Sequence, residues 1–267
     1  MNNKNFIEKT LDFAKTVTTH VGRKIVVYNE ITSTNDKAKE LAQTGADEGT
    51  IVIARTQEKG RGRFDRVWYS PIGGIYLSVI VKPQIPAEKT TLLSLIGALA
   101  VAKTITSNYN LRAMIKWPND VRIKGKKVAG ILLESEIDRN QIRYVILGIG
   151  INLNIDVNRF PRTLKHAATS LSQEFERPVD YHQFLGDLLS RLDSYYTMVI
   201  NEEFETILRE WKERSDTLGR KIRVVTLTEE IMGEACDVDE SGFLVVHTEA
   251  DEYRTITAGD CLYCDER

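Results

Sequence analysis

Cysteine, long apolar runs and excess charge of one sign are all scarce in this 267-residue sequence. Its 3 cysteines are too few for a disulfide framework, so we expect a reducing, cytoplasmic location. No run of about 18 apolar residues is present, which predicts no membrane span, and the N-terminal residues lack the apolar core of a signal peptide. The net charge of -2 argues against general nucleic-acid binding.

Familiar nucleotide and metal fingerprints are missing as well. There is no GxxxxGK[ST] phosphate loop and no GxGxxG segment that opens a helix. Cys261 and Cys264 form a single CxxC pair, whereas a structural zinc usually needs two such pairs or added histidines. A plain position at a strand end is therefore favoured for these cysteines.

The hydrophobic pattern predicts an α+β fold, with a mixed, largely antiparallel sheet backed by helices. Helices are expected at 4–18, 34–44, 88–107, 181–200 and 203–215, and the third is apolar on most sides, so it should be buried. Short turns between the later strands favour antiparallel pairing. Strands are expected at 24–28, 50–55, 74–82, 113–118, 120–125, 126–136 and 142–154.

The C-terminal stretch has a different pattern. Four short strands, at 220–227, 231–239, 242–248 and 253–259, predict a small β-barrel. We therefore expect two domains, residues 1–216 and residues 217–267.

Four segments carry polar or glycine-rich chemistry, and two of them lie outside the strands. Ser33–Asn35 offers two hydroxyls and an amide at an expected helix N-terminus, although a simple N-cap would also explain it. Gly60–Arg63, with Gln57 upstream, combines backbone freedom with guanidinium groups suited to phosphate or carboxylate. A solvated charged loop or a nucleic-acid contact is the alternative for this second segment.

The other two segments belong to expected strands. Lys116 ends an apolar strand, so it should lie at a sheet edge near the mouth of any pocket, where it could bind phosphate or simply rest its stem on the sheet. Its neighbour Trp117 is expected in the core. Gly148 and Gly150 alternate along a strand, which removes side chains from one face and indicates close approach of a ligand or of another strand.

In this order and spacing, the segments resemble the catalytic core of biotin protein ligases, also called biotin–[acetyl-CoA-carboxylase] ligases. The shared motifs are STN, QxxGRGR, KWPND followed by GKKxxGIL, and GIGIN, and they cover about residues 25–155. The resemblance implies a class II synthetase-like catalytic domain followed by a small SH3-like domain. It also implies an ATP-dependent enzyme that forms biotinyl-5'-AMP and transfers biotin to a lysine of a biotin carboxyl carrier protein or domain.

The resemblance further implies a site in which Lys116, Arg61 and Arg63 are catalytic, because the biotin carboxylate and the α-phosphate of ATP repel each other. Segment 60–66 is implied to close over the ligands and exclude water. The implied biotin contacts are Ser33, Thr34, Asn35, Gln57, Gly60, Arg61, Gly62, Arg63, Lys116, Gly148 and Gly150, the last two leaving room for the bicyclic ring. The implied ATP contacts are Arg61, Arg63, Trp68, Lys116, Asn119 and Asn152, and Asn152 is also expected near Mg²⁺.

Two departures from the family pattern matter. Asp65 stands where the family loop has glycine, which adds a negative charge and bears on loop closure and on retention of the adenylate. Fewer than 25 residues precede the first expected strand, so we expect no helix-turn-helix domain and no specific DNA binding. Homodimerisation is a further expectation from the family.

Three alternatives compete with this interpretation. The first is a related acyl enzyme, a lipoate ligase or octanoyltransferase, although such enzymes lack the GRGR and KWPND motifs. The second is a non-enzymatic module that senses a ligand or binds nucleic acid. The third is a ligase inactivated by Asp65.

Overall fold

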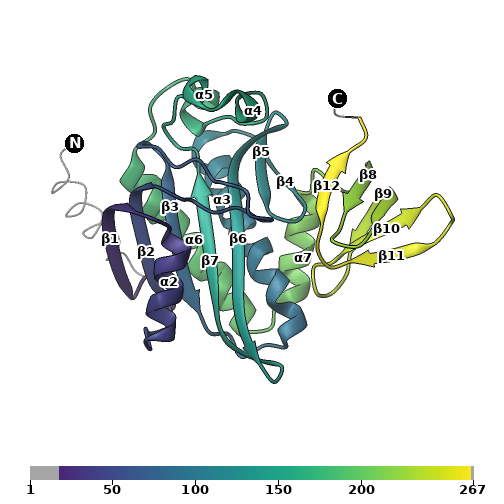
Figure 1. Cartoon of the computed structure of the whole chain (residues 1–267), viewed down its shortest axis with the longest axis horizontal. Coiled ribbons are helices and arrows are strands. Elements are labelled where there is room, and N and C mark those ends of the chain that lie inside the picture. The colour runs from purple at the N-terminus through teal and green to yellow at the C-terminus, as the bar shows by residue number, and fades with distance from the viewer. Residues whose placement is uncertain (1–17, 266–267) are drawn as a thin grey trace.

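The computed structural model describes residues 18–265, so the helix expected at 4–18 lies almost wholly outside the described residues. The described part contains a 7-stranded sheet and, after it in the chain, a 5-stranded sheet (Figure 1). The larger sheet runs in the order β1-β2-β3-β7-β6-β5-β4. Only its β1–β2 pair is parallel, which confirms a mixed, largely antiparallel sheet.

The strands of the larger sheet fall close to the expected segments, and each strand extends or shortens by a few residues at its ends. Their bounds are β1 (Lys24–Ile31), β2 (Thr50–Gln57), β3 (Ile75–Val81), β4 (Ala113–Lys116), β5 (Asp120–Ile123), β6 (Lys126–Asp138) and β7 (Gln141–Ile151).

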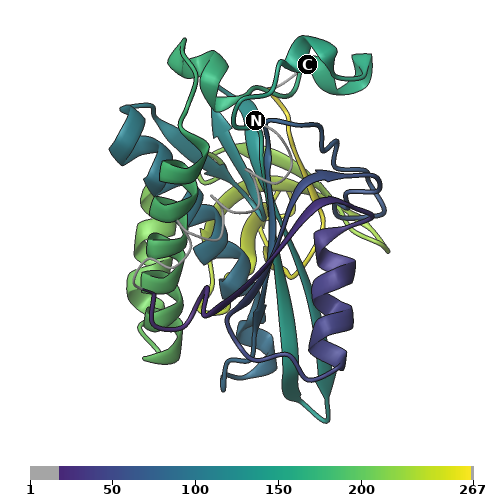
Figure 2. The ribbon, with the colours of Figure 1, turned by 90° about the vertical axis from the view of Figure 1, so that its left-hand side faces the viewer.

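Helices cover both faces of this sheet (Figure 2). On one face lie α3 (Thr91–Tyr109), α6 (Tyr181–Ile200) and α7 (Phe204–Glu213), and on the other lies α2 (Thr34–Gln43). Strand alternation supplies both faces: Val145 and Leu147 of β7 join the main core, while Tyr144 and Ile146 pack beneath α2.

The helix from Ala87 to Tyr109, which comprises the 3-10 turn η1 (Ala87–Thr90) and α3, is long and apolar enough to cross a membrane. However, 72% of its apolar window is buried inside the protein. It packs against α6 and the sheet, so it is the buried core helix that the sequence predicts.

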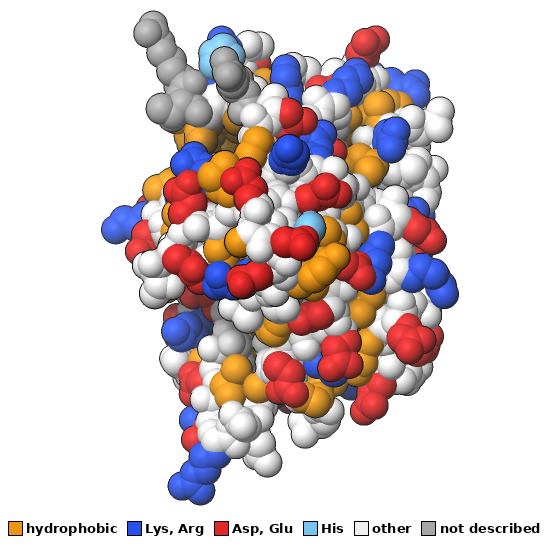
Figure 3. Space-filling view, turned by 90° about the vertical axis from the view of Figure 1, so that its right-hand side faces the viewer, with side chains coloured by type: hydrophobic (Ala, Val, Ile, Leu, Met, Phe, Trp, Pro, Cys, Tyr) orange, Lys and Arg blue, Asp and Glu red, His pale blue; other side chains and the backbone are white. Residues whose placement is uncertain are grey.

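The smaller sheet has five strands in the order β11-β10-β9-β8-β12, so the expectation of four was wrong. The missed strand, β12, has only 4 residues, follows a glycine and begins with an aspartate, so no alternation could reveal it. Acidic, basic and apolar side chains are interspersed on the side of the molecule that carries this sheet (Figure 3). The strands are β8 (Lys221–Val225), β9 (Glu230–Val238), β10 (Leu244–Thr248), β11 (Tyr253–Ile256) and β12 (Asp260–Tyr263).

Three short helical segments between β7 and α6 carried no sequence prediction, because none is long enough to show a helical period. They are η2 (Val157–Arg159), α4 (Arg162–Lys165) and α5 (Leu171–Phe175). α4 and α5 lie at one end of the larger sheet (Figure 1).

Candidate active site

A cavity of about 650 Å³ opens on the α2 side of the larger sheet and gathers most of the predicted site residues. Gly60 is not in its wall: an added Cβ there would lie 2.4 Å from the carbonyl oxygen of Trp68 and 2.5 Å from Ser70 Oγ, so Gly60 serves close backbone packing beneath the loop. The predicted residues that line the cavity are Ser33, Thr34, Asn35, Gln57, Arg61, Gly62, Arg63, Trp68, Lys116, Asn119, Gly148, Gly150 and Asn152.

Glycines form the floor of this cavity. Gly148 and Gly150 continue the face of β7 that lies under α2, and Gly150 pairs with Gly130 of β6. A Cβ on Gly150 would lie 2.6 Å from the Trp68 ring, and one on Gly148 would lie 2.1 Å from Asn35 Oδ1. The predicted bare strand face is therefore present, and the side chains of Trp68 and Asn35 lie over parts of it. Room for a bicyclic ring beside these glycines stays a prediction.

The polar end of the cavity is the N-terminus of α2. Ser33 caps the helix, because its side chain accepts a hydrogen bond from the backbone N–H of Asp36. The backbone N–H and the hydroxyl of Thr34 both donate to Gln57 Oε1, at 2.8 and 3.0 Å. Gln57 Nε2 in turn donates to Ser70 Oγ at 2.8 Å. The N-terminus of α2 thus provides both the helix cap and the polar groups of the pocket that the sequence predicts.

Two carboxylates, those of Asp36 and Glu134, bind the side chains of Asn35 and Arg61. Asn35 Nδ2 donates to Glu134 Oε2 at 2.7 Å. Arg61 forms ion pairs with Asp36 at 2.6 Å and with Glu134 at 3.1 Å. The hydrogen bond to Asp36 is the largest cause of a raised pKa at Arg61, so this guanidinium stays charged.

Residues 60–66, which carry Arg61, Arg63 and Arg66, form a tight hairpin. Arg61 pairs with Val67 across it, and Gly62 N donates to the carbonyl oxygen of Arg66 at 2.7 Å. Phe64 and Asp65 at its tip have φ angles of 53° and 56°, the left-handed pair that a type I′ turn requires. A glycine in place of Asp65 would adopt that conformation without steric cost, which gives the family glycine a physical reason.

The loop lies against the smaller sheet. Arg66 pairs with Asp260 at the start of β12 through both guanidinium nitrogens. The Arg63 guanidinium lies 4.9 Å from the ring centroid of Phe64, and burial is the largest cause of its lowered pKa. The cavity wall is thereby completed by residues of both sheets.

Lys116 ends β4, an edge strand of the larger sheet, as the sequence predicts. Its Nζ lies 4.3 Å from the ring centroid of Tyr263 in β12, a cation–π contact that orients the ammonium group. Trp117 is buried in the core, and its Nε1 donates to the carbonyl oxygen of Gly242 at 3.2 Å.

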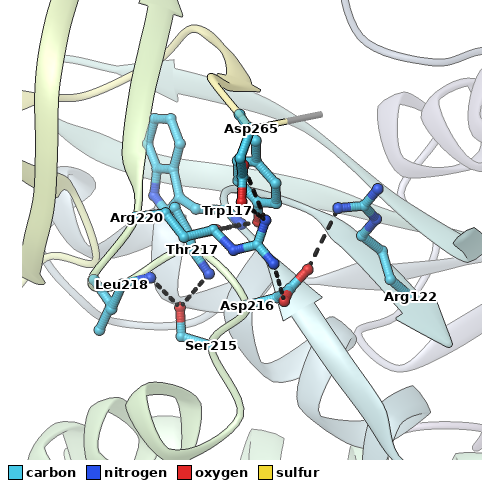
Figure 4. A network of polar contacts seen from close by, with 9 residues as sticks. Trp117, Arg122, Ser215, Asp216, Thr217, Leu218, Arg220 and Asp265 are labelled. Carbon is cyan, nitrogen blue, oxygen red and sulfur yellow. Dashed lines mark hydrogen bonds and ion pairs between the residues drawn. The ribbon is translucent and has the colours of Figure 1, made fainter. Parts of the chain in front are cut away.

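The residues that follow α7 form a network of polar contacts (Figure 4). This network supports the junction between the two sheets beside Lys116. Thr217 accepts a hydrogen bond from Trp117 N at 2.9 Å, and Ser215 Oγ accepts from the backbone N–H groups of Thr217 and Leu218. Asp216 lies between Arg122 and Arg220, at 3.3 and 3.4 Å. The position of Lys116 therefore depends on contacts between the two sheets.

Sequence reasoning missed several residues of the cavity wall. Arg66 and Lys127 lie inside the motifs, and Lys127 contacts Asp120 at 2.5 Å and lies 5.3 Å from the Trp68 ring centroid, so closer attention to charge there could have found them. Eight others carry no local signal, because segments far from the motifs supply them: Phe160, Pro161, Leu164, Ala167, Ala168, Asp260, Cys261 and Leu262.

No group of three or more His, Cys, Asp or Glu side chains within residues 18–265 is placed to hold a metal ion. The oxygen donors of the cavity wall include Asp120 and Asn152, and Asn152 commits its Nδ2 to the carbonyl oxygen of Thr169 at 3.0 Å. Magnesium commonly binds one or two protein oxygens while substrate phosphates and water supply the rest. This donor set fits an ion that is carried mainly by a nucleotide. Cys261 and Cys264 are free thiols.

The cavity thus combines hydrogen-bonding groups at the N-terminus of α2, a glycine floor on β7, and cations from the hairpin and from the end of β4. Residues 27–152 match the Biotin/lipoate A/B protein ligase family, and residues 217–262 match the Biotin protein ligase C terminal domain. The fold and the cavity therefore define a protein of the class that attaches acyl cofactors to proteins.

Individual relatives narrow this class. The bifunctional ligase/repressor BirA of Bacillus subtilis is 38% identical over 229 residues, which are 85% of this chain and 70% of that protein. A biotin--[acetyl-CoA-carboxylase] ligase of Paracoccus denitrificans is 35% identical over 219 residues, which are 80% of this chain and 90% of that protein. A biotin protein ligase from Aquifex aeolicus, solved with biotin and ATP, is 26% identical with a TM-score of 0.76, covering 90% of this chain and 98% of that chain. The chain belongs to the biotin protein ligase family.

Proposed function

We propose that this protein is an ATP-dependent biotin protein ligase, which forms biotinyl-5'-AMP and transfers biotin to a lysine of a biotin carboxyl carrier protein or domain. The observation that carries the proposal is the single cavity in which Thr34, Gln57, Arg63 and Lys116 meet. Polar groups that can match a cyclic urea lie in the same cavity as cations that can neutralise a carboxylate and phosphates.

In the first step, a biotin carboxylate oxygen attacks the α-phosphorus of ATP, and pyrophosphate leaves with the electrons of the broken P–O bond. Both reactants are anions, so catalysis consists mainly of positioning and charge neutralisation. Lys116, Arg61 and Arg63 supply the positive charge, and Trp68, Asn119 and Asn152 contribute to the nucleotide side of the cavity. Mg²⁺ bound to the phosphates would add further positive charge, with Asn152 as its proposed protein donor.

In the second step, the acceptor amine attacks the acyl carbonyl, AMP leaves, and the amine proton passes to solvent. The mixed anhydride must be kept from water until the acceptor arrives. The contact of Arg66 with Asp260 of β12 supports this role for the hairpin of residues 60–66. We assign catalysis and the covering hairpin to residues 1–216, and support of the hairpin through Asp260 to the second domain, residues 217–267.

A direct assay tests the proposed function. The full chain is incubated with ATP, Mg²⁺, biotin and a biotin carrier domain, and biotin on the carrier is detected with streptavidin. Lipoate and octanoate are supplied in parallel as acyl donors to distinguish the related acyl enzymes, and their attachment is read from the intact mass of the carrier, because streptavidin does not bind them. Labelling of the carrier by biotin alone supports the proposal, whereas labelling by lipoate or octanoate, or no labelling, contradicts it.

Lys116→Ala is expected to slow biotin-dependent pyrophosphate release by about 10²–10³-fold, because one fixed cation is lost where two anions react. The matched control is Lys126→Ala, which removes an exposed lysine that does not line the cavity. Equal rates in Lys116→Ala and the unchanged protein would exclude Lys116 from catalysis. A cytoplasmic location, homodimerisation and the lack of specific DNA binding remain predictions of the sequence.

A further inference from the structure

Tyr263 of β12 is a buried tyrosine that lies next to the cavity without lining it. The residue is only 5% exposed and is absent from the cavity wall, whereas Lys116 is part of that wall. The ammonium nitrogen of Lys116 lies over the Tyr263 ring, 4.3 Å from its centroid. Tyr263 therefore contacts a lysine of the cavity wall and not a ligand inside the cavity.

The position of the Tyr263 ring is fixed from two sides. Its backbone pairs with β8, where it lies opposite Ile222. Its hydroxyl lies 2.9 Å from Thr217 Oγ1, which also accepts a hydrogen bond from the backbone N–H of Trp117 at 2.9 Å. Because Trp117 follows Lys116 in the chain, Thr217 links the tyrosine hydroxyl to the backbone beside the lysine. The hydroxyl thus anchors the ring, and the face of the ring contacts the ammonium group.

Two arginines also lie over the Tyr263 ring, at 4.4 Å for Arg220 and 5.4 Å for Arg122. Cations this close to one another repel, so the cluster needs negative charge beside it. Asp216 lies between the two arginines, at 3.3 and 3.4 Å (Figure 4). The face of an aromatic ring is also negative, and it attracts the cations that lie over it. Asp216 and the ring together therefore favour a fixed ammonium group at Lys116 despite the neighbouring arginines.

We propose that Tyr263 is a positioning residue for adenylation, and that the face of its ring holds the Lys116 ammonium group in place for the reacting anions. The inference rests on the proposed function, in which Lys116 neutralises charge as the biotin carboxylate attacks ATP. A free lysine side chain samples many rotamers, and ordering it costs free energy. A ring that orders the side chain in advance removes that cost from the reaction.

Tyr263→Leu and Tyr263→Phe separate the ring face from the hydroxyl. Tyr263→Leu removes the ring, and it is expected to slow biotin-dependent pyrophosphate release about three- to tenfold, the effect of one partly buried cation–π contact. Tyr263→Phe keeps the ring, so its rate should stay within about twofold of the unchanged protein. Losing the hydroxyl contact with Thr217 should nevertheless lower its melting temperature. Rates are measured on the full chain with saturating ATP, Mg²⁺ and biotin, below the melting temperature of each variant.

A double-mutant cycle tests whether Tyr263 acts through Lys116. In a Lys116→Ala background, Tyr263→Leu should slow the residual rate by less than about twofold, because the ammonium group is already absent. Tyr253→Leu is the matched control, since it makes the same replacement in the same sheet, at a residue that is 71% exposed and outside the cavity wall. Its rate should equal that of the unchanged protein.

Fluorinated phenylalanines at position 263 keep the test decisive if Tyr263→Leu does not fold. Each added fluorine weakens the negative face of the ring with little change of shape. The rate of pyrophosphate release should therefore fall stepwise from Tyr263→Phe to its difluorinated and trifluorinated forms. A purely structural role of the ring predicts no such trend.

The reactivity of Lys116 measures the contact without any enzyme activity. Trace acetylation of the ligand-free protein, read by mass spectrometry relative to the exposed Lys126, should rise at least about twofold at Lys116 in Tyr263→Leu, because the ring no longer shields the ammonium group. Tyr263→Phe should leave it unchanged.

Several results would overturn the inference: an unchanged rate in Tyr263→Leu, an equal loss in Tyr263→Phe, an equal loss in the Lys116→Ala background, no trend with fluorination, or unchanged reactivity of Lys116 in Tyr263→Leu. Absence of biotin-dependent pyrophosphate release in the unchanged protein would instead refute the proposed function.

Discussion

Asp65, at the tip of the 60–66 hairpin, combines an uncommon backbone conformation with a negative charge. Asp65 adopts a left-handed conformation that glycine adopts more readily, yet aspartate is among the residues that tolerate it best. The hairpin therefore closes with this residue, and the third alternative from the sequence, a ligase inactivated by Asp65, finds no support in the loop geometry. What Asp65 adds is an exposed negative charge beside arginines.

Asp65→Asn is expected to lower the KM for ATP by up to about twofold, because an exposed charge contributes only a few tenths of a kcal/mol to its neighbours. The effect should shrink as salt is raised. Steady-state adenylation at low and high ionic strength measures it. Asp138→Asn, at the exposed far end of β6, is the matched control. A twofold rise in KM would contradict the electrostatic argument.

Cys261 is a buried thiol in the cavity wall, and burial raises its pKa to about 12. The folded state therefore favours the neutral thiol, while the unfolded chain ionises near its ordinary pKa. The stability that results is complete below about pH 8.5 and is lost as pH rises toward the folded value.

The free energy of unfolding should thus fall between pH 8 and pH 10 by up to about 2 kcal/mol more in the unchanged protein than in Cys261→Ala. Urea unfolding at the two pH values provides the comparison, and the difference between the variants cancels the titration of other groups. Parallel pH profiles would rule out a buried neutral thiol.

At the level of elements, periodicity decided which parts of the site were predictable. β7 and β6 alternate over many residues, so the bare strand face at Gly148 and Gly150 was evident from the sequence. The N-cap at Ser33 follows a local rule and was equally clear. The contact of the hairpin with β12 obeys no local rule, because Arg66 and Asp260 are separated by 194 residues.

Asp260→Asn is expected to free the hairpin and to speed tryptic cleavage after Arg63 or Arg66 by up to about fivefold, since an exposed ion pair contributes at most about 1 kcal/mol. Limited proteolysis followed by mass spectrometry measures the rate at each site. Asp265→Asn, which removes an exposed partner of Arg220 instead, should leave cleavage unchanged. Equal protection in Asp260→Asn and the unchanged protein would show that the pair does not hold the hairpin.

For the whole molecule, the junction between the two sheets determines whether the site is complete. Trp117 joins the larger sheet to the carbonyl of Gly242, and Tyr263 of β12 lies beside Lys116. The two sheets also share one apolar core, so we expect them to unfold together.

Trp117→Phe is expected to cost about 1 kcal/mol and to lower the melting temperature by roughly 2–4 °C, because the Gly242 carbonyl loses its donor. Trp211→Phe is a matched control: Trp211 is equally buried, and its Nε1 has no hydrogen-bond partner among the described residues. It should cost less than Trp117→Phe, since both variants lose the same ring volume but only Trp117→Phe loses a hydrogen bond. Calorimetry measures the melting temperature of both variants. An equal fall in the two would show that the hydrogen bond to Gly242 does not stabilise the fold.

The sequence by itself determined every strand except β12, the long helices of the described residues, the cap at Ser33 and the family motifs, because each is written in neighbouring residues or in a fixed period. Only the tertiary structure decided the fifth strand of the smaller sheet, the short helices after β7, and the pairing of Arg66 with Asp260. It also decided what fills the space over Gly148 and Gly150, where Asn35 and Trp68 now lie. Such features depend on which distant segments pack together, and side-chain packing in three dimensions leaves no periodic trace in the chain.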